Sequence, residues 1–151
     1  VQPVGAFSTE PLVTVRSMPS YIDKLALVLI QGRRQLVARS IGKSVFFTPG
    51  GKREPGEDDH AALCRECREE LTVTLIRESI RPYGVFEAEA FGKSAGTVVR
   101  MTCYTADYEG TLAPNEEVEE LAWIQSDFPS EKLSEAGRII LQDLKEKSLI
   151  D

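Results

Sequence analysis

The order of apolar and polar positions along the chain predicts a β-rich domain with two helices. Residues 21–30 form an uninterrupted apolar, β-prone run, which is typical of a central strand. Residues 35–39 follow after a turn, so these two runs predict a hairpin. Further β-prone runs that predict strands occupy residues 45–48, 72–76, 80–90, 97–108 and 121–124.

Two other stretches have helical spacing. From Asp58 to Leu71 no Pro or Gly interrupts the chain, and Asp58 or Asp59 can cap the start. Residues 134–147 predict a second helix, because apolar side chains recur on one face. That face consists of Leu133, Ala136, Ile140 and Leu144. The order of strands and helices predicts an α/β/α sandwich, with a mixed β-sheet between the helices.

The first 19 residues differ in composition from the rest. They contain three prolines and little periodicity, which indicates an irregular N-terminal arm with a short strand at residues 12–16. Two roles stay open for this arm: it crosses the sheet, or it contributes to a homodimer. Residues 20–151 contain no linker, repeat or low-complexity tract, and we interpret them as a single domain.

Composition narrows the class of protein. The 151 residues, 42% hydrophobic and 28% charged, are ordinary for one globular domain. The net charge of −6 disfavours nucleic acids and membrane surfaces as partners, and it favours a cation-dependent site for a small phosphorylated ligand. No apolar run approaches the roughly 20 residues of a membrane helix, and no basic signal-peptide segment is visible. Three cysteines make no disulfide framework, so the cytoplasm is the expected compartment.

The stretch with the most chemistry is a glycine-rich turn that leads into the first predicted helix. On that helix three carboxylates share one face, because residues three and four apart are neighbours: Glu66, Glu69 and Glu70. Like charges at this spacing repel, and a hard divalent cation such as Mg²⁺ offsets the repulsion. A solvated acidic face is the usual interpretation of a charge run, but the preceding glycine turn favours the metal.

This stretch resembles the Nudix box of the MutT-like hydrolases, G-x5-E-x7-R-E-U-x-E-E-x-G-U, where U is a bulky aliphatic residue. The match begins at Gly51, passes through Glu57 and continues from Arg65. Cys67 stands where an aliphatic residue is usual, and it still serves as a small hydrophobe. Thr72 stands where the second glycine is usual. Because glycine accepts the positive φ of a helix exit and threonine accepts it poorly, the geometry of this exit stays open.

The resemblance implies a Mg²⁺-dependent pyrophosphohydrolase, with Mn²⁺ as an alternative ion. The small-molecule partner it implies is a nucleoside diphosphate linked to a group X. A nucleoside triphosphate, cut to a nucleoside monophosphate and pyrophosphate, is the first expectation. The alternatives are a nucleotide-sugar pyrophosphatase and a non-catalytic domain that senses a ligand or binds a partner.

By the same resemblance, the metal ligands are the carbonyl of Gly50 and the three helical carboxylates, Glu66, Glu69 and Glu70. Glu57 and Arg65 are implied to orient these ligands, since partners behind a metal ligand fix its geometry. The general base is implied to be a box glutamate or an acid before the last strand.

For the base, we favour Glu117 or Glu120 among the acids before that strand. Candidates for substrate binding are cationic or aromatic side chains near the box or on loops: Arg39, Lys52, Arg53 and Phe91. For Arg39, a solvated surface position is an equally good interpretation. A rival Zn²⁺ or redox site would use His60, Cys64, Cys67 and Cys103. Packing in the core is the default for these cysteines, because the C-x-x-C pair lies inside the helix and not at its N-terminus.

Overall fold

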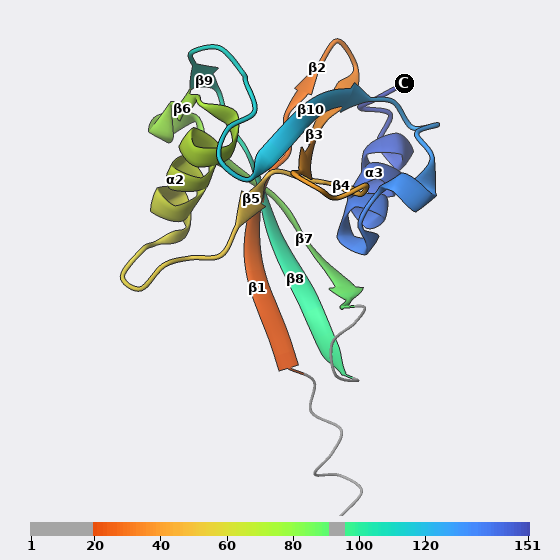
Figure 1. Ribbon diagram of the computed structural model, residues 1–151, viewed down its shortest axis with the longest axis horizontal. Coiled ribbons are helices and arrows are strands. Elements are labelled where there is room, and N and C mark those ends of the chain that lie inside the picture. Colours follow the sequence, from red (N-terminus) through yellow and green to blue (C-terminus); the bar gives the residue numbers. More distant parts are fainter. Residues whose placement is uncertain (1–19, 91–95) are drawn as a thin grey trace, which may run out of the picture.

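The computed structural model describes residues 20–90 and 96–151 (Figure 1). The predicted arm at residues 1–19 and the candidate Phe91 lie outside the described residues. The strands are β1 (Ser20–Leu27), β2 (Ile30–Gln31), β3 (Arg34–Ser40), β4 (Phe46–Phe47), β5 (Gly50–Gly51), β6 (Thr74–Leu75), β7 (Arg81–Glu89), β8 (Thr97–Thr105), β9 (Tyr108–Glu109) and β10 (Val118–Ile124). The α-helices are α2 (Asp59–Leu71) and α3 (Glu135–Glu146), and the 3-10 turns are η2 (Arg77–Ser79) and η3 (Ser130–Lys132).

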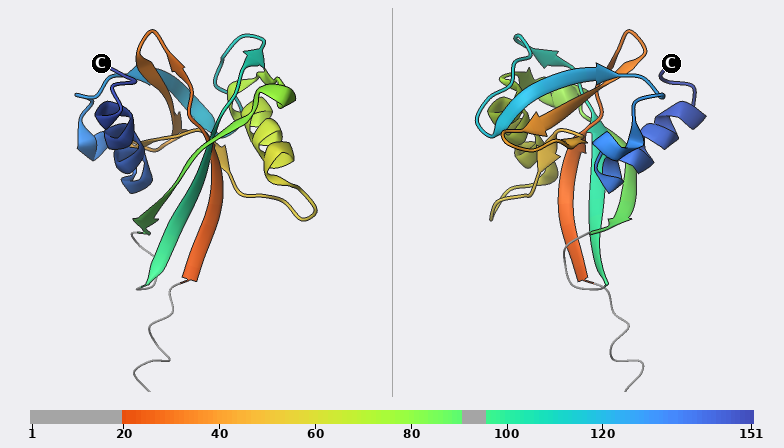
Figure 2. Two further views of the ribbon diagram at one scale, coloured as in Figure 1. Left: turned by 180° about the vertical axis from the view of Figure 1, so that it is seen from behind. Right: turned by 45° about the vertical axis from the view of Figure 1, so that its right-hand side comes forward.

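The strands form two main sheets between the helices. The first sheet has the order β5-β1-β8-β7, in which β1 and β8 are parallel and the other neighbours are antiparallel. The second has the order β10-β3-β2, with β4 added to β3, while β6 and β9 form a small ribbon. Figure 1 and Figure 2 show α2 and α3 on opposite sides of this β-structure. The predicted α/β/α sandwich is confirmed, with its strands divided between sheets.

The predicted strand at residues 21–30 is two strands, because the chain changes sheets at Val28 and Leu29. Val28 N donates to Tyr104 O of β8 at 2.8 Å, so this residue still belongs to the first sheet. Leu29 O accepts from Leu36 N of β3 at 2.9 Å, which places the next residue in the second sheet. The predicted hairpin therefore consists of β2 and β3, and β1 pairs elsewhere.

Two other strands differ in length from the prediction. The expected strand at residues 97–108 divides into β8 and β9. The last strand begins at Val118, so Glu119 and Glu120 lie on β10 and not in a loop before it. The apolar run starts only at residue 121, and for this reason the sequence pattern does not predict the charged first half of the strand.

Both helices begin at side-chain caps, and the cap of the first helix was predicted. Asp58 Oδ1 accepts from Ala61 N at 2.7 Å, and Ser134 Oγ accepts from Gly137 N at 3.0 Å. Side chains buried beneath α2 include Leu25, Leu27, Leu63, Cys67 and Leu71. Side chains buried beneath α3 include Val37, Cys103, Ile124, Ile140 and Leu144. No helix within the described ranges is long and apolar enough to cross a membrane.

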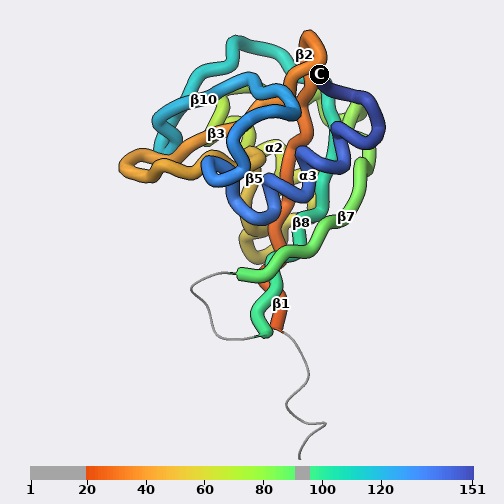
Figure 3. Tube along the Cα trace, turned by 90° about the vertical axis from the view of Figure 1, so that its right-hand side faces the viewer, coloured from red at the N-terminus to blue at the C-terminus, as the bar shows by residue number. Residues whose placement is uncertain are grey.

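The segment after α3 returns to the second sheet, and Figure 3 shows the C-terminal end beside β2. Arg33 forms an ion pair with Asp151 and donates to Ser148 O at 3.0 Å. Asp151 N donates to Arg33 O at 3.0 Å, and Ile150 is buried. These contacts fasten residues 148–151 to the β2–β3 hairpin.

Candidate active site

The glycine turn before α2 brings backbone and carboxylates together. Gly50 and Gly51 form β5, which pairs with Ala26 and Leu25 of β1. A Cβ atom on Gly50 would lie 1.9 Å from Leu25 O, and one on Gly51 would lie 1.8 Å from Glu66 Oε2. Glycine is therefore needed at both positions, at the first for the approach of a backbone and at the second for the approach of a carboxylate.

Arg65 is the centre of the charged network on α2. Its Nε and Nη2 donate to the two oxygens of Glu57 at 2.8 and 2.9 Å, which is a bidentate pair. Its Nη1 donates to Glu66 Oε1 at 3.0 Å and to Glu69 Oε1 at 3.1 Å. Arg65 lowers the pKa of Glu57 to about 2, and Glu57 in turn raises the pKa of the guanidinium. The predicted supporting pair is thus in contact, and it also reaches two of the predicted metal ligands.

Glu70 lies on the buried side of this network. Its Oε1 accepts from Gly50 N at 2.9 Å. Burial is the main cause that raises the pKa of Glu70 to about 8, and the charges of Glu66 and Glu117 raise it further. Burial also raises the pKa of Glu66, against the opposing effect of Arg65. Two neighbouring carboxylates are therefore held in surroundings that disfavour their negative charge.

The donor set fits a hard divalent cation in its chemistry. Three carboxylates and a backbone carbonyl offer oxygen ligands, and one guanidinium does not offset the partly buried charge of Glu66 and Glu70. Within the described ranges, no group of three His, Cys, Asp or Glu side chains is assembled for a metal. The three box carboxylates instead make separate hydrogen bonds. Glu66 and Glu69 accept from Arg65, whereas Glu70 accepts from the Gly50 amide.

Comparison with known protein families identifies the family to which the chain belongs. The model of the NUDIX domain matches residues 21–144, which is most of the chain. The chain belongs to the Nudix family. Nudix hydrolases act on nucleoside diphosphate derivatives, so the chain is a pyrophosphohydrolase. None of the curated proteins compared with it matches.

Several solved structures have the same fold. The MutT Nudix hydrolase from Burkholderia pseudomallei is 25% identical, with a TM-score of 0.67 over 82% of this chain and 97% of that chain. The E. coli ORF135 protein is 23% identical, with a TM-score of 0.66 over 85% and 94%. A bifunctional NMN adenylyltransferase/ADP ribose pyrophosphatase from Francisella tularensis, in complex with AMP and a Mn ion, is 18% identical, with a TM-score of 0.63 over 92% and 45%.

The two candidate bases outside the Nudix box have different surroundings. Glu120 Oε1 forms an ion pair with Arg39 Nη2 at 3.0 Å, and Glu119 forms another with Arg39 Nη1 at 2.9 Å. Arg39 therefore already has two carboxylate partners, and it also lies over the ring of Phe46. The charge of Glu117, in contrast, acts on Glu70. Of the two, only Glu117 is linked to the box carboxylates in this way.

The other predicted substrate ligands lie on the turn before α2. Arg53 forms an ion pair with Asp59, and Asp59 also accepts from Tyr104 Oη at 2.6 Å. Lys52 uses its backbone oxygen to accept from Arg65 Nη2 at 3.0 Å, and its side chain is exposed. The turn therefore carries one exposed cation and one that is partly neutralised.

The residues of the rival zinc site are not brought together. Cys103 is buried in the cluster beneath α3, whereas Cys67 is buried beneath α2. Burial raises the pKa of both thiols, that of Cys103 to about 12, so neither has the thiolate character of a ligand or nucleophile. His60 packs edge-on against Tyr104. These side chains have packing roles.

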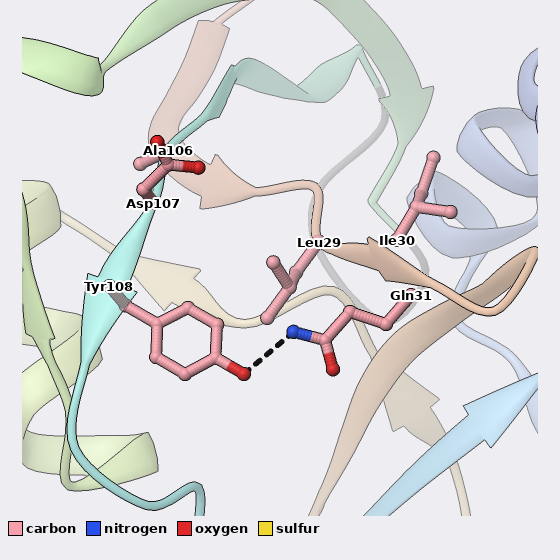
Figure 4. A pocket seen from close by; sticks show the side chains of 6 residues that line it. All are labelled: Leu29, Ile30, Gln31, Ala106, Asp107 and Tyr108. Atoms are coloured by element: carbon pink, nitrogen blue, oxygen red, sulfur yellow. Dashed lines mark hydrogen bonds between the residues drawn. The ribbon is translucent and has the colours of Figure 1, made fainter.

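One cavity lies between β2 and β9, with a volume of about 510 Å³ (Figure 4). Its walls include Leu29, Asp107 and Tyr108, and Gln31 Nε2 donates to Tyr108 Oη at 2.7 Å across it. No box residue lines this cavity. It is therefore not part of the carboxylate site.

Sequence reasoning missed the residues that connect α2 to the segment before β10. Asn115 Nδ2 donates to Glu69 O at 3.0 Å, and Thr72 Oγ1 lies 2.9 Å from Thr111 O. An Asn after a Pro signals a turn, but no local signal identifies a partner 46 residues away. Thr72 itself keeps the glycine geometry, with φ 60° and ψ 24°.

Proposed function

We propose that the chain hydrolyses a nucleoside diphosphate linked to X with the aid of Mg²⁺, and that a nucleoside triphosphate is cut to a nucleoside monophosphate and pyrophosphate. The observation that carries this proposal is the pair of partly buried carboxylates, Glu66 and Glu70, beside the glycine turn. Burial raises the pKa of both carboxylates, and a bound cation would offset their negative charge. A divalent ion bound to the substrate phosphates would supply positive charge beside Glu66 and Glu70.

The proposed metal ligands are Glu66, Glu69, Glu70 and the Gly50 carbonyl. Magnesium, when bound, neutralises phosphate charge and lowers the pKa of a bound water. Arg65 and Glu57 keep the ligands on one side of α2 through the bidentate pair at 2.8 and 2.9 Å. The AMP and Mn ion in the Francisella tularensis structure agree with a nucleotide substrate and with Mn²⁺ as an alternative ion.

Glu117 is the better candidate for the base that takes the proton of the attacking water. Its charge acts on Glu70, whereas Glu120 is paired with Arg39. Lys52 is the best candidate for a phosphate contact, because its side chain is exposed on the glycine turn. We retain Arg39, Arg53 and Phe91 as candidate substrate contacts. For Arg39 and Arg53, a substrate would compete with the present acidic partners.

A nucleotide panel with and without Mg²⁺ tests the proposal. We expect Mg²⁺-dependent release of pyrophosphate or of a phosphorylated X group from at least one nucleotide. Glu69→Gln keeps the size of the side chain and removes its charge, so it should lower turnover by at least tenfold without loss of folding. Glu146→Gln on α3 is the matched control and should have no effect.

Turnover that is unchanged in Glu69→Gln would contradict the proposed metal set. Metal-dependent binding of a nucleotide without any release of phosphate would instead favour a ligand-sensing domain. Release from nucleotide-sugars alone would favour the nucleotide-sugar pyrophosphatase. The cytoplasmic location and the homodimer are separate hypotheses. The result of the nucleotide panel does not depend on either of them.

A further inference from the structure

Three contacts join the last turn of α2 to the segment at residues 110–117. Ala113 N donates to Leu71 O at 3.0 Å, and Asn115 Nδ2 donates to Glu69 O at 3.0 Å. Thr72 Oγ1 lies 2.9 Å from Thr111 O and 2.6 Å from Leu71 O. The last carbonyls of a helix have no partners inside it. Two of the three contacts satisfy such carbonyls with groups from a distant part of the chain.

The residue at the helix exit is unusual for its backbone conformation. Thr72 adopts φ 60°, a region that costs little for glycine and more for a β-branched residue. A strained residue of this kind persists where its surroundings determine it. Glycine would allow the same exit, so the hydroxyl is what threonine adds. That hydroxyl has two carbonyl oxygens within reach, and its contact with Thr111 O is the one that connects the two segments.

The same segment is held at its other end by backbone hydrogen bonds. Glu117 O accepts from Ile41 N at 2.9 Å, and Asn115 O accepts from Val118 N at 3.0 Å. Glu116 between them also has a positive φ of 52°. The backbone around Glu117 is thus fixed from both sides, and Asn115, two residues before it, contacts the last turn of α2.

We propose that Thr72 and Asn115 are positioning residues for Glu117. They fasten residues 111–117 to the end of α2, so that the backbone that carries Glu117 keeps its place beside the helix of the box carboxylates. This inference rests on the proposed function in one respect: Glu117 acts as the base in nucleotide hydrolysis. The departure from the box glycine is then a functional feature of this chain.

Substitutions at Thr72 separate the hydroxyl from the backbone conformation. In Thr72→Gly the strain is relieved and the hydroxyl is lost, so we expect equal or higher Tm with kcat about tenfold lower and KM within twofold of the wild type. Thr72→Ser keeps the hydroxyl and should restore kcat. Asn115→Ala should resemble Thr72→Gly in kcat. Thr111→Ala is the matched control, because only the backbone oxygen of Thr111 takes part, and it should leave kcat unchanged.

Hydrogen exchange of residues 109–118 gives a readout that does not depend on turnover. We expect amides of this segment to exchange faster in Thr72→Gly than in the wild type, and at the wild-type rate in Thr72→Ser. If Thr72→Gly shows wild-type exchange, or faster exchange with unchanged kcat, the positioning role is refuted. If the wild type hydrolyses no nucleotide, the proposed function fails, and the exchange rates still decide whether the hydroxyl fastens the segment.

Discussion

Replacing Glu70 by Gln should stabilise the metal-free protein, and the gain should grow with pH. Glutamine has nearly the same shape, and its Oε1 can still accept from Gly50 N, a contact of 2.9 Å in the wild type. The variant removes only the partly buried negative charge. Because burial raises the pKa of Glu70 from 4.5 to about 8, the folded wild type binds a proton that the unfolded chain releases.

The sign and size of the effect follow from this pKa. Between pH 4.5 and about 8 the folded state binds more protons at Glu70, so the free energy of unfolding of the wild type falls as pH rises. Each pH unit costs up to about 1.4 kcal/mol, which gives an upper limit of about 3 kcal/mol at pH 7. With solvent screening we expect about 1–2 kcal/mol. For a chain of this length, that is a Tm increase of roughly 2–8 °C.

Denaturant unfolding in EDTA at pH 5, 6, 7 and 8 measures the difference, with the single Trp123 as the fluorescent reporter. Glu146→Gln on α3 is the control and should follow the wild type at every pH. Added Mg²⁺ should raise the stability of the wild type more than that of Glu70→Gln, because a ligand stabilises the state that binds it. A Glu70→Gln variant that is no more stable than the wild type at pH 8 would refute the reasoning from burial.

Two further predictions concern the glycine turn and the C-terminal segment. Gly51→Ala should fold with a Tm near that of the wild type but lose at least tenfold in turnover, because its Cβ displaces the flexible Glu66 carboxylate 1.8 Å away. Gly50→Ala should instead lose stability in thermal unfolding, since its Cβ meets the backbone oxygen of Leu25 at 1.9 Å; equal Tm values for the two variants would contradict this distinction. Arg33→Ala should lower Tm by roughly 2–4 °C, because about 1 kcal/mol of contacts to residues 148–151 is lost. Arg34→Ala is the control and should leave Tm unchanged. Equal effects of the two variants on Tm would contradict a contribution of these contacts to stability.

Local chemistry explains why the box helix could be predicted from the sequence. Asp58 caps it, no Pro or Gly interrupts it, and its acidic face follows from residue spacing alone. The pairing of Glu57 with Arg65 was predicted from the resemblance, and the contacts at 2.8 and 2.9 Å agree with it. These features depend on residues close in sequence or within one motif.

The features that sequence did not reveal depend on partners far along the chain. Residues 28 and 29 are as apolar as their neighbours, so no pattern marks the point where the chain changes sheets. Glu119 and Glu120 lie on a strand that pairs with β3, where Arg39 contacts both, and a charged run alone does not predict that. The pattern of one sequence indicates the apolar face of each strand or helix, but it does not indicate which other element packs or pairs with it.

The charges of the box explain how the helix can form before any metal is bound. Three carboxylates on one face would oppose folding, but Arg65 contacts two of them and also Glu57. Glu70 is the exception, because it accepts from the neutral Gly50 amide, and burial raises its pKa. If the proposed ligands bind the metal, we expect folding and metal binding to be coupled mainly through Glu70. It follows that substitution of Glu70 should change the metal dependence of stability more than substitution of Glu69, whose charge Arg65 already offsets.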